Sequence, residues 1–233
     1  MEPIPTETMD NPNQEIGRVT RSKEEARKSY NRLSRWYGML AGPFERKCRI
    51  RGLRKLRAGE KEIVLEIGFG TGKGIQALAR SVGSSGMVYG IDISDGMLTV
   101  TLSRLRRLGL EKRVVLKRGD AAALPFGSNG IDAVFMSFTL ELFDTPEIPI
   151  VLGECRRVVR KNGRICVVAM SKEQNPGLLA RLYQWAHCRY PGLIDCRPIH
   201  VEDALKDAGF SILDAETVSL AGLPVGIVLA AKP

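Results

Sequence analysis

Segments with the pattern of β-strands alternate with segments with the pattern of α-helices over residues 62–170, and this alternation restricts the fold more than any other feature of the sequence. The second helical segment is the clearest, because Leu98, Leu102 and Leu105 recur at helical spacing. A strand–helix–strand order requires crossover connections, which place helices on both faces of a parallel sheet. The predicted strands are 62–67, 87–93, 113–118, 131–137, 163–170, 211–218 and 225–231, and the predicted helices are 73–81, 95–108, 147–160 and 201–209.

The chain of 233 residues, 44% of them apolar, is long enough for a domain with a substantial core. No apolar run reaches the roughly 18–20 residues of a membrane span, and the beginning of the chain lacks the basic region and apolar stretch of a secretory signal. We therefore expect a cytoplasmic protein. The five cysteines are scattered and contain no C-x-x-C pair, which argues against a disulfide framework and against a zinc site, so we expect no metal.

Composition divides the chain into three parts. Residues 1–17 are predicted to be a flexible tail, since they carry three prolines and little periodicity. Residues 18–58 are predicted to be a basic helical cover, because they hold fourteen Lys or Arg and three Glu, in a chain whose net charge is +9. Residues 59–233 are the predicted binding domain, with an insertion at 171–200 that is expected to cover the substrate.

A glycine-rich run, VLEIGFGTGKG at 64–74, follows the first predicted strand and leads into a predicted helix. Ligands of open α/β sheets bind beyond the carboxyl ends of the strands, so this loop is a predicted cofactor site. The run fails the P-loop pattern G-x-x-x-x-G-K-[ST], because Gly74 follows Lys73. It also fails the dinucleotide pattern G-x-G-x-x-G, whose third glycine position falls on Lys73. The remaining pattern is G-x-G-x-G at Gly68, Gly70 and Gly72, preceded by Glu66.

Carboxylates end the next two predicted strands. Asp92 can accept hydrogen bonds from ribose hydroxyls in NAD enzymes and in others alike, so it does not discriminate between cofactors. Asp120 can accept one from an adenine amine, and NAD folds do not require an acid there. Structural roles compete with these: a helix N-cap for Asp92, a turn cap for Asp120 and a strand-end charge for Glu66. A nicotinamide-dependent reductase therefore stays open at this point.

Five motifs in order carry a family resemblance: VLEIGFGTG, GIDIS, GDAAALPF, IDAVFMSFTLELF and LGECRRVVRKNGRICVV. They resemble those of Rossmann-like (class I) S-adenosylmethionine-dependent methyltransferases, in the branch of the ubiquinone/menaquinone-biosynthesis and phospholipid N-methyltransferases. The resemblance implies an α/β fold with a seven-stranded, mostly parallel sheet, an antiparallel last strand, helices on both faces and extra N-terminal helices. YNRLSRWYGML at 30–40 resembles the Tyr-rich helix of that branch, with Asn31 and Gly38 in place of its two usual acids.

The resemblance implies a role for each matching residue in binding S-adenosyl-L-methionine, whose product is S-adenosyl-L-homocysteine. Glu66 would lie near the amino group of the methionine moiety, Asp92 would bind the ribose hydroxyls, and Asp120 would accept from the adenine amine. The other implied cofactor-binding residues are Gly68, Gly70 and Gly72 under the carboxylate and ribose, Ile93, Met97 and Ala121 around the adenine, and Ser137 and Phe138 facing the sulfonium. Plain helix packing explains Met97 equally well.

Transfer from a sulfonium requires mainly alignment of the acceptor, and it requires a base only where the acceptor is protonated. The predicted base candidates are His187 and His200, both in the insertion, and Glu141, just past the fourth strand. Tyr37 is a further candidate. The predicted substrate-binding residues are Tyr30, Tyr37, Tyr190 and Arg197, although Arg197 could equally close a tight turn with Asp195.

The acceptor class is inferred from what the sequence holds and lacks. It has neither N/D-P-P-Y after the fourth strand nor a Pro-Cys dipeptide, so we expect no nucleic-acid partner. The insertion is rich in Leu, Tyr and Trp, which favours a small lipophilic acceptor, either a quinone precursor or a phospholipid headgroup. Basic amphipathic helices suit peripheral contact with an anionic membrane. The alternatives are a methyltransferase acting on a soluble small metabolite and a cofactor-binding protein without activity; no pattern indicates the oligomeric state.

Overall fold

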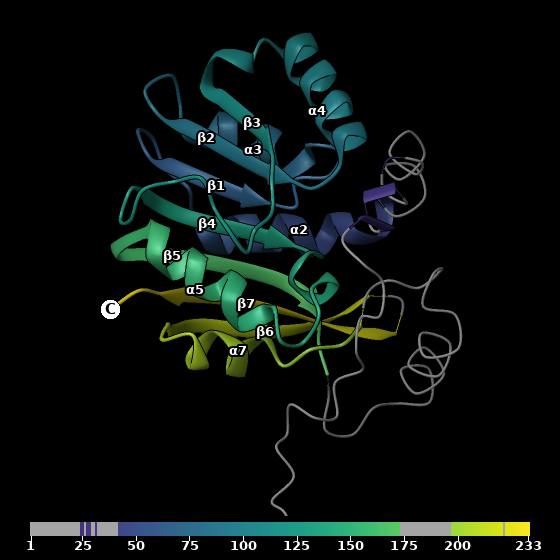
Figure 1. Cartoon of the computed structure of the whole chain (residues 1–233), viewed down its shortest axis with the longest axis vertical. Coiled ribbons are helices and arrows are strands. Elements are labelled where there is room, and N and C mark those ends of the chain that lie inside the picture. Colours follow the sequence, from purple (N-terminus) through teal and green to yellow (C-terminus); the bar gives the residue numbers. More distant parts are fainter. Residues whose placement is uncertain (1–23, 26, 29–30, 32–41, 173–196, 221) are drawn as a thin grey trace, which may run out of the picture.

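The computed structural model describes residues 24–25, 27–28, 31, 42–172, 197–220 and 222–233. They form a seven-stranded sheet in the order β3-β2-β1-β4-β5-β7-β6 (Figure 1). The strands are β1 (Ile63–Ile67), β2 (Met87–Asp92), β3 (Val114–Arg118), β4 (Ile131–Ser137), β5 (Val159–Met170), β6 (Ser211–Leu220) and β7 (Leu223–Ala231). Neighbours among β1 to β5 are parallel, and β7 runs antiparallel to β5 and β6. This confirms the predicted mostly parallel sheet with an antiparallel last strand.

Helices cover both faces of the sheet (Figure 1). One face carries α2 (Gly42–Leu56), α3 (Lys73–Ser81) and α4 (Asp95–Leu108), and the other carries α5 (Ile148–Val158) and α7 (Val201–Asp207). Short 3-10 helices, η2 (Glu111–Arg113) and η3 (Leu140–Leu142), follow α4 and β4. Each face therefore has its own apolar core.

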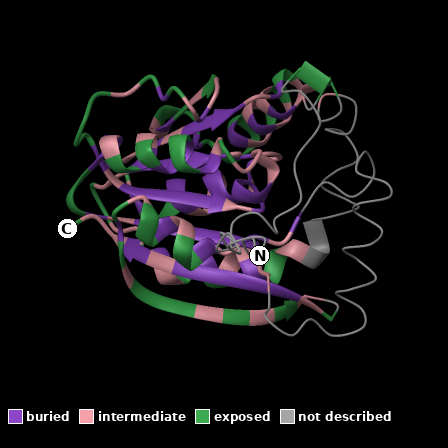
Figure 2. Ribbon diagram, turned by 60° about the horizontal axis from the view of Figure 1, so that its bottom comes forward, coloured by how far each residue is buried: buried purple, intermediate pink, exposed green. Residues whose placement is uncertain are grey.

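The sequence of β1 shows why two cores form. Successive side chains of a strand point to opposite faces, so a strand covered on both sides must be apolar at consecutive positions. Val64 belongs to the core beneath α2, α3 and α4, whereas the next residue, Leu65, belongs to the core beneath α5 and α7. The edge strand β6 differs, because most of its residues are exposed or only partly buried (Figure 2).

β5 begins earlier than predicted, at Val159 and directly after α5. Val159 pairs with Ile131 of β4, and the register between these strands shifts before Ala133. The intervening residues 160–162 are Arg, Lys and Asn, so they carry no apolar pattern that could reveal a strand. Main-chain hydrogen bonds of Asn162 and Gly163 with Lys232, and the ion pair of Arg160 with Asp132, hold this polar stretch in place.

α2 packs directly on the sheet. Leu56 is fully buried, and a Cβ on Gly52 would overlap the side chain of Val168 on β5. Arg164 of β5 donates to the main-chain carbonyl of Leu56 at 2.5 Å. α2 and the sheet therefore share one apolar core. An amphipathic pattern shows that a helix has an apolar side, but it does not show whether that side packs on a sheet or over a site.

The predicted insertion leaves the sheet at the end of β5 and the chain returns just before α7. The N–H of Ile199 donates to the carbonyl of Met170 at 3.0 Å, and the N–H of Lys172 donates to the carbonyl of Ile199 at 3.2 Å. Ser171 and Ile199 pair as an isolated parallel bridge. We call residues 170–172 and 199 the neck. The residues between its two sides, 173–196, lie outside the described part of the chain, as does the predicted tail.

The described residues contain no helix that is long and apolar enough to cross a membrane. Within the same residues, no group of three or more His, Cys, Asp or Glu is arranged to hold a metal ion. Cys48, Cys155 and Cys166 are buried free thiols.

Candidate functional site

The glycine loop joins the end of β1 to the start of α3, and its backbone strongly favours glycine. Gly68, Gly70 and Gly72 have φ angles of 70°, 50° and 75°, which most side chains disfavour. Space adds a second constraint, because a Cβ on Gly68 would overlap Thr139 and one on Gly72 would overlap Thr101. Gly68 and Gly70 line a pocket above the loop, whereas Gly72 caps the start of α3 behind it.

Glu66 lies on β1 and lines the same pocket, with only 2% of its surface exposed. Its Oε2 atom has no hydrogen-bond partner. Burial is the main cause that raises the pKa of this carboxyl to about 8. The positive charge of Arg49 opposes the shift, and the negative charge of Asp92 adds a smaller increase. A buried polar atom without a partner is costly. A cationic group of a ligand in the pocket would supply the missing partner.

Gly74, in the first turn of α3, explains how Glu66 fits. A Cβ at residue 74 would overlap the Oε1 atom of Glu66. Any side chain there would push the carboxyl out of its place against the helix. The fourth glycine of the run is therefore required by the position of the acid.

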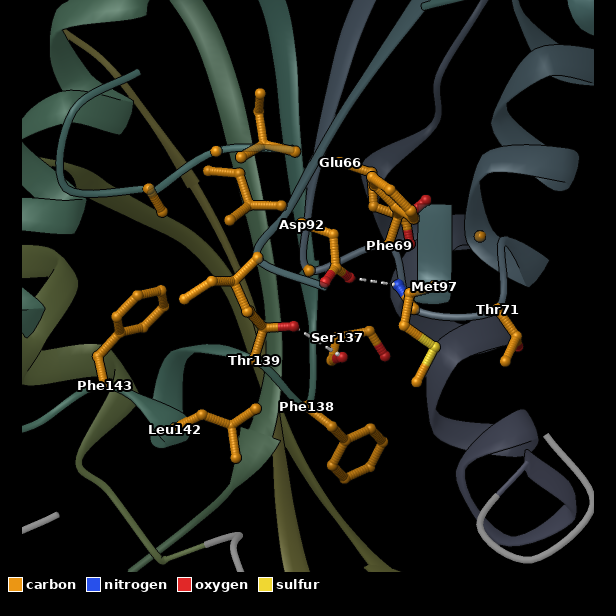
Figure 3. Close-up of a pocket in the computed structure, with 18 of the residues that line it drawn as sticks. Glu66, Phe69, Thr71, Asp92, Met97, Ser137, Phe138, Thr139, Leu142 and Phe143 are labelled. Atoms are coloured by element: carbon orange, nitrogen blue, oxygen red, sulfur yellow. Dashed lines mark hydrogen bonds between the residues drawn. The ribbon is translucent and has the colours of Figure 1, made fainter. Parts of the chain in front are cut away.

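Asp92 ends β2 and holds the glycine loop. Its Oδ2 accepts from the N–H of Gly70 at 2.8 Å (Figure 3). Its Oδ1 accepts from the N–H of Ser94 at 2.9 Å. Ser94 itself is the N-cap of α4, since its hydroxyl accepts from the N–H of Met97. The competing role of N-cap thus belongs to Ser94, and Asp92 is left facing the pocket. Burial raises the pKa of Asp92, and the two N–H donors oppose that shift.

Asp120 follows β3 and has the turn contact that the competing structural role predicts. One carboxylate oxygen accepts from the N–H of Ala122 at 3.0 Å, which makes a local turn. The residue also lines the pocket, together with Ile93, Met97 and Ala121. The structure thus brings ten of the eleven predicted cofactor-binding residues to one pocket, and Gly72 is the one that lies outside its lining.

The far wall of the pocket comes from the segment after β4. Ser137 and Phe138 were predicted there, and the structure adds Thr139, Leu142 and Phe143 (Figure 3). Figure 3 shows Leu142 and Phe143 across the pocket from Glu66 and Met97. Phe138 has a φ of 54°, and such strained bulky residues cluster at functional sites. The sequence motif SFTLELF contained these residues, but it looks like any short apolar segment.

Four charged residues that line the pocket were not predicted. Glu45 and Arg49 of α2 line it and form an ion pair at 3.7 Å, with side chains that are 16% and 11% exposed. Lys73 also lines it, and burial, then Arg49 and Arg104, lower the pKa of its amine. Glu147 lines the opposite wall. No sequence signal identified α2 as part of this site, because its basic residues follow one another without a motif.

Asn31 connects the N-terminal region to the site. Its Oδ1 accepts from the hydroxyl of Ser94 at 2.6 Å and from the N–H of Gly96 at 3.0 Å. It occupies one of the two positions where the resembling branch usually has an acid. Like a carboxylate, the amide oxygen of Asn31 accepts hydrogen bonds, but it carries no negative charge.

The predicted base candidates are not brought together in the described residues. Glu141 is fully buried in η3 and does not line the pocket; its Oε1 accepts from the N–H of Met170 at 3.2 Å. His200 occupies the N-cap position of α7, outside the pocket lining. His187, Tyr30, Tyr37 and Tyr190 lie outside the described residues.

Arg197 is 1% exposed and also lies outside the pocket lining, so the structure does not place it against a substrate. Its guanidinium instead donates to the main chain and to one hydroxyl of the η3 segment. These contacts are structural, and the substrate role of Arg197 stays a prediction. Asp195, its predicted partner in a tight turn, lies outside the described residues.

Comparison with known proteins agrees with this arrangement. Residues 64–163 match the family described as a methyltransferase domain. Over this stretch, 100 of the 233 residues, the chain is similar to class I methyltransferases. Its match covers the glycine loop, both carboxylates after β2 and β3, and the segment after β4. S-adenosylmethionine is the cofactor of this class, and the buried, unpartnered Glu66 carboxyl fits the amine of that molecule.

Curated relatives of this methyltransferase domain match over about half of the chain. The demethylmenaquinone methyltransferase of Lactobacillus johnsonii is 34% identical over 123 residues, which are 53% of this chain and 50% of that protein. The 2-phytyl-1,4-naphtoquinone methyltransferase of Synechococcus elongatus is 35% identical over 121 residues, which are 52% of this chain and 50% of that protein. The chain thus spans about half the length of the curated relatives it matches.

Solved structures share the fold over more of the chain. A structure of the cyclase SpnF covers 94% of this chain and 98% of its own at a TM-score of 0.74 and 20% identity. A structure of a SAM-dependent methyltransferase from Aquifex aeolicus covers 79% of this chain and 89% of its own, at a TM-score of 0.59 and 23% identity. At these identities the likeness concerns the fold alone. Since one of the two is named for another reaction, the activity of the methyltransferase domain must be argued from its site.

Proposed function

We propose that the protein transfers a methyl group from S-adenosylmethionine to a small lipophilic acceptor of the quinone-precursor class. One observation carries the proposal: a single pocket has the unpartnered Glu66 carboxyl on one side and the apolar side chains of Phe138, Leu142 and Phe143 on the other (Figure 3). The first side suits the amino-acid end of the cofactor and the second suits an apolar acceptor. The names of the naphthoquinone and menaquinone relatives support the acceptor class.

The proposed cofactor contacts are supported by the residues that line the pocket. Glu66 would bind the amine, Asp92 the ribose hydroxyls and Asp120 the adenine amine, while the bare main chain of Gly68 and Gly70 allows close approach. Arg49 and Lys73, the cations that line the pocket mouth, are proposed to hold the carboxylate. When bound, S-adenosylmethionine supplies a methyl group that is already activated by its sulfonium. The residues of this chain would orient the acceptor and exclude water.

A hydroxylated aromatic acceptor would need a group that takes its proton. Among the described residues that line the pocket, Glu45 and Glu147 are carboxylates to which no cofactor contact is assigned above. Glu141 and His200 are less suited, because neither lines the pocket. His187 stays a proposal for this role.

Calorimetry and labelled transfer test the proposal. We expect S-adenosylhomocysteine to bind and NADH not to bind, and we expect label from methyl-labelled S-adenosylmethionine to appear on a short-chain 1,4-naphthohydroquinone. NADH binding alone would overturn the cofactor assignment. Cofactor binding with label only on water-soluble metabolites of a cell extract would favour the alternative acceptor.

An Asp92→Ala variant tests the cofactor map within this proposal. It should weaken binding of S-adenosylhomocysteine by about 1–3 kcal/mol, the cost of losing hydrogen bonds to a charged group. Asp95→Ala is the matched control, because Asp95 is a nearby carboxylate that pairs with Arg27 and Arg118 on the surface and does not line the pocket. Equal affinity in the Asp92 variant and the wild type would show that the map is misplaced.

We also propose that the protein is cytoplasmic and contacts anionic membranes through α2. Five cationic side chains of and just after this helix are exposed: Arg46, Lys47, Arg51, Arg54 and Arg57. The same helix lines the pocket mouth through Glu45 and Arg49. A membrane lying against this side would therefore be near the entrance through which a lipophilic acceptor enters. Each basic residue near an anionic surface contributes about 1 kcal/mol.

Sedimentation with vesicles tests this contact. The double variant Arg51→Gln/Arg54→Gln should bind vesicles containing 30% phosphatidylglycerol at least tenfold more weakly than the wild type in low salt, on the scale of about 1 kcal/mol for each charge. The variant Arg106→Gln/Arg107→Gln removes the same charge from the exposed end of α4 and should change binding much less. Equal losses in both variants, or no binding by the wild type, would refute docking through α2.

A further inference from the structure

The acceptor wall of the pocket depends on a segment that is not part of the sheet. Leu142 ends η3 and Phe143 follows it, and both line the pocket. Two main-chain hydrogen bonds fold this segment, from the N–H of Leu142 to the carbonyl of Thr139 at 3.1 Å and from the N–H of Phe143 to the carbonyl of Leu140 at 3.3 Å. One turn of 3-10 helix is weak support for a binding surface. Other contacts must hold it in place.

Arg197 supplies such contacts from the far side of the insertion. Its Nε donates to the carbonyl of Glu141 at 3.3 Å, its Nη2 to the carbonyl of Phe143 at 2.5 Å and its Nη1 to the hydroxyl of Thr145 at 2.9 Å. The three acceptors lie along one stretch of chain. A planar guanidinium can span them at fixed angles, whereas the single amine of a lysine cannot.

The burial of Arg197 shows that these bonds are structural. The residue is 1% exposed, and a buried charge is tolerated only where its hydrogen bonds are made. The neck lies close by in the chain, since Ile199 pairs there with Met170. Glu141 joins the same region, because its carboxyl accepts from the N–H of Met170 at 3.2 Å. The η3 segment is thus tied to the chain on both sides of the insertion.

We infer that Arg197 is a positioning residue for the acceptor: it holds Leu142 and Phe143 in the pocket wall and thereby sets the shape of the acceptor end. This inference takes its substrate from the proposed function. The hydrogen bonds that Arg197 makes to the pocket wall do not depend on that function. The cofactor end of the pocket is built from β1, β2, β3 and the glycine loop, which Arg197 does not contact in any hydrogen bond described above. Loss of Arg197 should therefore disturb the acceptor end of the pocket more than the cofactor end.

The experiment compares Arg197→Lys with Arg164→Lys. Arg164 is a matched control, because it also donates to main-chain carbonyls, those of Leu56 and Arg57, but it lies outside the pocket lining. In Arg197→Lys we expect the KM for a short-chain 1,4-naphthohydroquinone to rise about tenfold, with kcat reduced less and with the Kd of S-adenosylhomocysteine changed less than twofold. Arg164→Lys should leave this KM unchanged. A Thr145→Val variant removes one of the three bonds and should raise KM by a smaller factor.

Hydrogen exchange gives a readout that does not require turnover. Amides of residues 140–146 should exchange about tenfold faster in Arg197→Lys than in the wild type, and those of the glycine loop should not. If the wild type methylates no naphthohydroquinone, the proposed function fails, while the exchange result still decides the role of Arg197. Unchanged exchange at 140–146 in a folded Arg197→Lys protein would overturn the inference, as would a loss of cofactor affinity as large as the rise in KM.

Discussion

Glu66 and Gly74 act as a pair, because the carboxyl of one fills the space that a side chain on the other would need. The acid comes from β1 and the glycine from the first turn of α3. A side chain at residue 74 would therefore displace the carboxyl of Glu66, either into the pocket or against its buried surroundings. The pair therefore gives a direct test of whether the acid must stay where it is.

Gly74→Ala should weaken binding of S-adenosylhomocysteine about tenfold or more and lower the free energy of unfolding by about 1–3 kcal/mol, the usual cost of overpacking. Gly153→Ala is the control. A Cβ at Gly153 in α5 meets nothing within 4 Å, so this change should stabilise the protein by about 0.5–1 kcal/mol through helix propensity. Calorimetry and urea unfolding measure the two effects. A stable Gly74→Ala protein with normal affinity would contradict the pairing.

The pKa of Glu66, raised to about 8 mainly by burial, predicts a pH-dependent affinity. Below pH 8 the carboxyl of the free protein holds a proton, and binding an ammonium group must release it. The affinity for S-adenosylhomocysteine should therefore rise with pH between 6 and 7.5, by up to about tenfold per unit. Above about pH 8 the gain should stop, because the Glu66 carboxyl of the free protein is then already ionised.

Calorimetry in buffers of different ionisation enthalpy counts the released proton. Glu66→Gln should bind more weakly at pH 7.5 and should show a flat profile. 5′-Methylthioadenosine lacks the amino-acid end, so its affinity for the wild type should show no such rise. If its affinity follows the same profile, another group, such as Asp92, is responsible.

At the scale of elements, α2 shows how a helix outside the matched methyltransferase segment becomes part of the fold. Arg164 donates to the carbonyls of Leu56 and Arg57 where the helix ends, and it pairs with Glu62 at 2.7 Å just before β1. One side chain thus joins α2, β1 and β5.

Arg164→Met should therefore lower the free energy of unfolding by about 1.5–3 kcal/mol, the range for hydrogen bonds to charged groups that are partly buried. Arg160→Met removes a pair with Asp132 on a side chain that is 48% exposed, and it should change stability by less than about 1 kcal/mol. Urea unfolding compares the two variants. Similar losses in both would mean that Arg164 does not hold α2 in place.

The sequence predicted most elements because their apolar patterns repeat over enough residues to be distinctive. The bounds of α3 and α4 agree with the prediction, since both helices have regular apolar stripes. The early start of β5 and the place of α2 on the sheet were not predicted, because each depends on pairing or packing with a distant partner. The same reason explains why Leu142 was not predicted to line the pocket and why Arg197 was not predicted to contact the segment after β4. Both features depend on contacts between residues that are distant in the chain.

At the scale of the whole molecule, two buried carboxyls link stability to pH. Burial is the main cause that raises the pKa of both Glu66 and Glu141 to about 8. Between about pH 4.5 and 8 the folded protein therefore holds protons that the unfolded chain releases. The free energy of unfolding should fall as pH rises through this window, by on the order of 1.4 kcal/mol per unit for each group.

Glu141→Gln should reduce this slope without removing the acceptor oxygen for Met170. Its stability relative to the wild type should increase from pH 5.5 to pH 7.5, as measured by urea unfolding at several pH values. Glu111→Gln, on the exposed η2, is the control and should leave the slope unchanged. Parallel curves for the wild type and Glu141→Gln would show that residue 141 binds no extra proton in the folded state.

The neck has a consequence for how such a protein can diversify. Met170, Lys172 and Ile199 join through main-chain atoms, so the join imposes no particular side chain on the stretch that it closes. Doubling the length of a closed loop costs only about 0.6 kcal/mol. We therefore expect that residues 173–196 can be exchanged as one piece, provided that Arg197 and its hydrogen bonds are kept. A chimaera that carries the corresponding stretch of a homologue should keep its sheet intact while it acquires a different choice of acceptor.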